Sequence, residues 1–161
     1  MAVHKLLIDD FETINYELIA VHSSLEDYRL AYFINRELST LFEKSPKHIG
    51  IKVKQGESCF SRFVYEDFDN DTYWNLIPNK GIILSREENG TSLFGETGMD
   101  VTTNVYLLPE LKKVDYIIKI EDSESSFDTD GFVDGLLQIK QISTAYKIDH
   151  QKLKSKNNLI F

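Results

Sequence analysis

Cysteine and proline are scarce in this sequence, and long apolar runs are missing. Among 161 residues there are one cysteine, Cys59, and three prolines. A single cysteine excludes an intramolecular disulfide and suits a reducing compartment, so we expect a cytoplasmic protein. No stretch approaches the ~20 consecutive apolar residues of a transmembrane helix, and the N-terminus lacks the apolar run of a signal peptide. We therefore expect no contact with a membrane.

Basic residues are also fewer than acidic ones. The chain has 18 Lys and Arg against 26 Asp and Glu, which gives a formal net charge of −8. Such a charge repels a phosphate backbone, so nucleic-acid binding is an unfavoured function. The basic residues are unevenly placed: four lysines lie between Lys147 and Lys156, against the single acid Asp149. This pattern predicts a basic C-terminal tail over about residues 148–161.

Patterns that carry catalysis or bind metals are missing too. The four histidines are far apart, and none has the spacing of a zinc site. The Asp-x-Asp-x-Asp run at 67–71 begins like a calcium loop, but Thr72 and Pro78 replace the glycine and the bidentate glutamate that such a loop needs, so it predicts a turn. Cys59 alone is more typical of a small packed residue than of a nucleophile. We expect no catalytic residue, metal site or cofactor.

The residues that are present indicate one domain, 1–161, of the α+β class. A hydrophobic content of 42% and a charged content of 27% are ordinary for a globular protein. The order of patterns is helix, strand meander, helix, which predicts an antiparallel sheet of about five to seven strands. Two main helices, at about 24–42 and 129–147, should pack on one face of that sheet.

The helix boundaries rest on capping patterns. Ser23-x-x-Glu26 has the spacing of a capping box at the start of the first helix, and Ser45-Pro46 should follow its end. Asp128 or Thr129 is suited to cap the second helix.

Alternating and β-branched segments predict the strands. We expect them at 14–21, 49–54, 59–66, 73–77, 82–85, 101–107 and 114–120, with a further short one at 6–8. Turn-forming residues, including Asn79-Lys80-Gly81, separate them. Residues 86–100 contain three glycines and predict a long loop. Pro109 cannot donate to a ladder, so residues 109–113 should form a one-turn connector between the last two strands of this series.

This connector carries a recognisable spacing. Leu108-Pro109-Glu110, three residues, then Val114-Asp115-Tyr116 resembles the signature of the bacterial IPExxxVDY family, with Leu108 in place of Ile. The resemblance implies a bacterial cytoplasmic protein. It implies no activity, cofactor or catalytic residue. Asp115 and Tyr116 are adjacent on a strand and therefore face opposite sides, so they cannot act together on one atom.

Two functions stay open at this level. The first is a non-enzymatic domain that binds another protein or a second copy of itself, as in a homodimer. The apolar triplet Leu159, Ile160 and Phe161 is its candidate partner-binding segment, because chain ends seldom keep such residues without a docking site. The same triplet could instead fold onto the core of its own chain.

The alternative is a small-ligand-binding protein or enzyme. Its pocket would lie between the sheet and the helices, would be lined by aromatic side chains and gated by residues 86–100. The candidate ligand-binding residues for this pocket are Arg62, Tyr65, Trp74 and Asp115.

Overall fold

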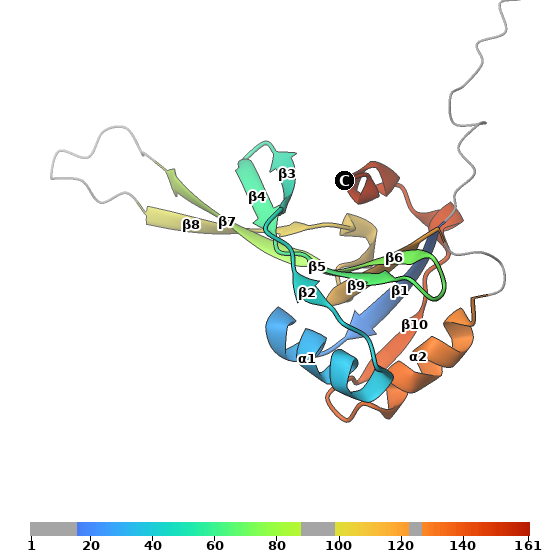
Figure 1. The fold of residues 1–161 in the computed structure, drawn as a ribbon. Coiled ribbons are helices and arrows are strands. Elements are labelled where there is room, and N and C mark those ends of the chain that lie inside the picture. The colour runs from blue at the N-terminus through green and yellow to red at the C-terminus, as the bar shows by residue number, and fades with distance from the viewer. Residues whose placement is uncertain (1–15, 88–98, 123–126) are drawn as a thin grey trace, which may run out of the picture.

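The computed structural model describes residues 16–87, 99–122 and 127–161, and its centre is a six-stranded antiparallel sheet (Figure 1). Along the sheet the strands are β10 (Thr144–Lys147), β1 (Tyr16–His22), β9 (Tyr116–Glu121), β6 (Thr72–Pro78), β5 (Phe63–Asp67) and β2 (Glu43–Lys44). Central strands β9 and β1 bury most of their residues, which are mainly apolar. The expected α+β class is confirmed.

Both helices, α1 (Asp27–Leu38) and α2 (Thr129–Gln138), cover one face of this sheet (Figure 1). Leu30 and Ile34 of α1 and Leu136 of α2 are buried in one cluster with Ile19 and Ile118 of the sheet. The expected packing of two helices on one face is therefore confirmed. None of the helices within the described residues is long and apolar enough to cross a membrane.

The start of α1 differs from the prediction. Its N-cap is Glu26, and no side chain makes a capping hydrogen bond there. Ser23 instead donates its hydroxyl to the carbonyl of Gln141 at 2.9 Å. The capping-box prediction is wrong because Ser23 is engaged by a tertiary contact. The helix ends at Leu38, earlier than predicted, where Ser39 adopts a φ of 55°.

The second helix is shorter than predicted. It ends at Gln138, and residues 144–147 form strand β10, which pairs antiparallel with β1. Ile139 and Ile142 follow the end of the helix and are still buried in the helix-side core. Their apolar spacing therefore looked like a continuation of the helix. Residues 144–147 form a strand because they pair with the edge of β1. Local periodicity cannot reveal a pairing between such distant segments. The predicted cap is confirmed: Asp128 Oδ1 accepts a hydrogen bond from the Gly131 N–H at 2.8 Å.

The opposite face of the sheet is covered by three segments of the chain. They are the hairpin of β3 (Ile49–Val53) and β4 (Gly56–Phe60), the connector between β8 (Met99–Tyr106) and β9, and residues 148–161. The strand predicted at 59–66 is two strands, β4 and β5, because the chain passes between two sheets at Ser61 and Arg62. The Ser61 hydroxyl donates to Asp27 Oδ2 at 2.6 Å and fixes this crossing.

Strands β7 (Lys80–Glu87) and β8 (Met99–Tyr106) form a two-stranded arm that extends away from the body (Figure 1). Its register runs from Lys80 opposite Tyr106 to Glu87 opposite Met99. The strands predicted at 82–85 and 101–107 are confirmed within it. The expected loop at 86–100 lies largely outside the described residues, and the expected strand at 6–8 lies wholly outside them.

Candidate functional site

The connector between β8 and β9, residues 107–115, is held by one asparagine. Asn79 lies between β6 and β7 and is fully buried. Its side-chain amide donates to the carbonyls of Leu111 (2.8 Å) and Val114 (3.1 Å), and its Oδ1 accepts from the Leu108 N–H (2.8 Å). Its own backbone N–H and carbonyl bond to the two ends of the connector. The connector is therefore fixed to the core through Asn79.

Glu110 joins this connector to the C-terminal tail. It lies in the short 3₁₀ helix Pro109–Leu111, and its Oε1 accepts from the backbone N–H groups of Lys154 (2.8 Å) and Ser155 (2.9 Å). Partial desolvation opposes the charged form, but the hydrogen bonds from Ser155 and Lys154 outweigh it and lower the pKa of Glu110 below its ordinary value. The charged carboxylate thus tethers the tail.

Asp115 and Tyr116 bind the loop between β1 and α1. Asp115 Oδ2 accepts from the Ser23 N–H at 2.9 Å, and the Tyr116 hydroxyl donates to the Leu25 carbonyl at 2.5 Å. Burial, with smaller contributions from Asp27 and Asp115, raises the pKa of Tyr116 to about 12. A phenol with so high a pKa that already donates to a backbone carbonyl is suited to hold structure.

Aromatic rings fill the space between the sheet and the helices where a pocket was expected. Trp74 is fully buried, and its ring centroid lies 4.7 Å from that of Phe132 and 5.2 Å from that of Phe127. Tyr65 packs 6.0 Å from the same indole. The Trp74 Nε1 donates to Thr72 Oγ1 at 2.7 Å, so its polar atom is satisfied. These rings form a packed cluster.

The four candidate ligand-binding residues therefore occupy three places. Tyr65 and Trp74 share the helix-side core, Asp115 lies at the start of β9, and Arg62 lies beside the terminal segment on the opposite face. The structure brings only the two aromatic residues together.

The candidate partner-binding triplet is divided between core and surface. Leu159 is 1% exposed and packs in the core opposite the helices, whereas Ile160 is 72% exposed. Phe161 is 40% exposed, and its ring lies 5.4 Å from Arg62 Cζ and 4.7 Å from Lys119 Nζ. The tail thus folds back on its own chain through Leu159.

A buried polar cluster lies under this terminal segment, and residue patterns alone did not reveal it. Lys119, in the centre of β9, donates from Nζ to the Leu159 carbonyl at 2.8 Å and pairs with Glu121. Asn75 is its neighbour on β6. Each is a polar residue flanked by apolar residues in its strand. This pattern in the sequence could have pointed to the cluster.

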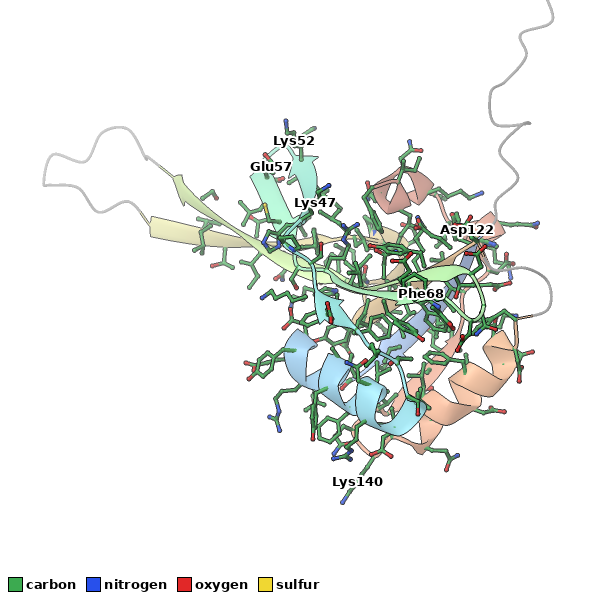
Figure 2. All side chains as sticks on the ribbon, viewed as in Figure 1. Lys47, Lys52, Glu57, Phe68, Asp122 and Lys140 are labelled. Carbon is green, nitrogen blue, oxygen red and sulfur yellow. The ribbon has the colours of Figure 1, made fainter. Side chains whose placement is uncertain are left out.

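A groove of about 410 Å³ opens between the β3–β4 hairpin and the arm. It is lined by consecutive residues of β3 (51–53) and of β8 (103–106), with Pro109, Lys112 and Asn158. Consecutive strand residues alternate between faces, so a groove that touches all of them runs along the strand edges. Neither edge is paired within the described residues. Figure 2 shows Lys52 at the outer end of the hairpin beside Glu57, its cross-strand neighbour.

Within the described ranges, no group of three His, Cys, Asp or Glu side chains could hold a metal ion. Comparison of the chain with protein-family models, with curated proteins and with solved structures gave no match.

Proposed function

We propose that this chain is a non-enzymatic interaction domain that binds an extended segment of a protein along the β7–β8 arm. Two exposed apolar side chains on the arm carry the proposal. Ile82 is 58% exposed and Leu84 is 76% exposed, and they lie two positions apart on β7, hence on one face. A lone two-stranded ribbon is only marginally stable in water, and unpaired strand edges recruit other chains. A bound chain would cover both the face and an edge.

The groove beside the arm supports the same function. Its floor includes Ile51, Val53 and Val105, and Lys52 and Lys112 lie along it. Strand addition supplies affinity through backbone hydrogen bonds and specificity through alternate side chains. The two lysines favour a partner segment with acidic side chains, since no acidic residue is among those that line the groove.

Origin and compartment are part of this proposal. The spacing Leu108-Pro109-Glu110-x3-Val114-Asp115-Tyr116 supports membership in the bacterial IPExxxVDY family. The single cysteine supports a reducing compartment such as the cytoplasm. The partner is either a different protein or a second copy of this chain.

The test compares two exposed leucines. Leu84→Glu places a charge on the arm, and Leu41→Glu places the same charge on an equally exposed leucine (72%) outside it. We expect Leu84→Glu to abolish capture of the partner from the native cell, or the dimer seen by light scattering at increasing concentration. Neither change should alter stability by more than about 0.5 kcal/mol, because both sites are on the surface.

Leu41→Glu should leave both readouts unchanged. Retention of the dimer or of the captured partner by Leu84→Glu would contradict the proposal. So would an equal loss with Leu41→Glu, because binding would then not depend on the arm.

A further inference from the structure

Three polar side chains converge under the terminal segment, on the face of the sheet opposite the helices. In the ladder, Asn75 of β6 lies between Val64 of β5 and Lys119 of β9. Cross-strand neighbours share a face, so Asn75 and Lys119 point to the same side. Arg62 precedes Val64 by two positions, and its guanidinium reaches the same place, because both it and Lys119 contact the ring of Phe161.

The hydrogen bonding of this cluster is incomplete. Asn75 is 0% exposed, and neither its Nδ2 nor its Oδ1 has a hydrogen-bond partner in the part of the chain that the structure describes. The buried Nε of Arg62 also has no partner there. Buried polar side chains nearly always have partners. The two donors among these atoms, Arg62 Nε and Asn75 Nδ2, therefore point to a bound group that accepts hydrogen bonds.

The charge of the cluster indicates the sign of that group. Among the described residues, the side chain of Arg62 makes one weak hydrogen bond, from Nη2 to Ser45 Oγ at 3.4 Å, and forms no salt bridge. Lys119 pairs with Glu121. These two cationic side chains and one carboxylate side chain sum to a net positive charge beside a fully buried asparagine, which suits a monoanion.

The ring of Phe161 lies beside both cations of this cluster. Leu159 anchors the segment in the core, and Lys119 Nζ holds its carbonyl at 2.8 Å. Beyond that anchor, Phe161 is held by the contacts of its ring with the two cations. Displacement of the Phe161 ring alone would therefore free the place that it occupies beside Arg62 and Lys119.

We propose that Arg62, Asn75 and Lys119 bind the carboxylate of a small apolar monocarboxylate, whose apolar group takes the place of the Phe161 ring. The guanidinium offers a planar pair of donors that matches a carboxylate, and its Nε is the donor without a partner. The Asn75 amide supplies one further donor. The slot between the cations already accepts a phenyl ring. This site lies apart from the arm and does not depend on the proposed interaction function.

The test uses phenylacetate as the probe and 2-phenylethanol as its neutral counterpart, titrated into the full chain by calorimetry. Phe161→Ala should bind phenylacetate about tenfold more tightly than the native chain, because the Phe161 ring no longer competes. Adding Arg62→Gln to that variant should weaken binding by about tenfold or more. Adding Arg36→Gln, which removes an exposed arginine on α1, should have no effect. 2-Phenylethanol should not bind.

Three results would overturn the proposal: no binding of phenylacetate to Phe161→Ala, equal binding of 2-phenylethanol, or no effect of Arg62→Gln. Circular dichroism checks that each variant is folded. If Phe161→Ala does not fold, the native chain decides the matter by NMR. Phenylacetate at saturating concentration must then shift the Arg62 Nε–H resonance and leave that of Arg36 in place, and an unmoved Arg62 resonance would refute the site.

Discussion

The two faces of the central sheet are built differently. On the helix side, large rings fill the core, and the one polar atom of Trp74 has its partner. On the other side, Asn79 satisfies the backbone groups of the connector, whereas the part under Phe161 buries Asn75 and Arg62 atoms without partners among the described residues. The helix face is thus a structural core, and the opposite face combines support with a candidate site.

The two buried asparagines give the sharpest test of this difference and the largest expected effect. Asn79→Leu should destabilise the protein by about 3 kcal/mol or more, because it leaves one N–H and two carbonyls of the connector buried without partners. Asn75→Leu should be neutral or stabilising, because no protein partner is lost. Urea denaturation of both variants measures this, and equal losses would show that the two sites do not differ.

How much of the fold could be predicted from the sequence depended on how far apart in the chain the interacting residues lie. Alternation located β6 and β9, and helical spacing located α1, because these patterns are local. The same spacing extended α2 wrongly through residues 144–147, since a strand that completes the edge of β1 can place its apolar residues at helical intervals.

The candidate sites could be predicted only in part. Arg62 was singled out, but for a pocket on the wrong side of the sheet. Its neighbours there, Lys119 and Phe161, lie 57 and 99 positions further along the chain. Asn79 was identified only as a turn residue, because its partners are in a connector about thirty residues later. Contacts of this kind depend on tertiary packing, which residue patterns do not encode.

The tail gives the next comparison, between two adjacent apolar residues. Leu159→Ala should cost about 2–5 kcal/mol, as expected for a leucine removed from a packed core. Ile160→Ala should change stability by no more than about 0.5 kcal/mol, because its side chain is largely in water. Thermal or urea unfolding measures both. A small loss for Leu159→Ala would mean that this end of the tail contributes little to the stability of the core opposite the helices.

The smallest expected effect concerns Glu110, which joins the tail to the connector. Its pKa is lower in the folded chain than its ordinary value of 4.5, so its contribution to stability is complete above pH 4.5 and is lost as the pH falls through the folded pKa. Glu110→Gln keeps the shape but removes the charged acceptor. Because Glu110 is exposed, its stability should differ from that of the native chain only slightly near neutral pH.

That difference should shrink further as the pH falls below 4.5, when the native carboxyl is itself protonated. Urea denaturation of both chains across this range measures the convergence. A gap between them that stays constant with pH would mean that the carboxylate charge does not hold the Lys154 and Ser155 amides. The tail would then be kept on the sheet face opposite the helices by its other contacts, such as those of the buried Leu153 and Leu159.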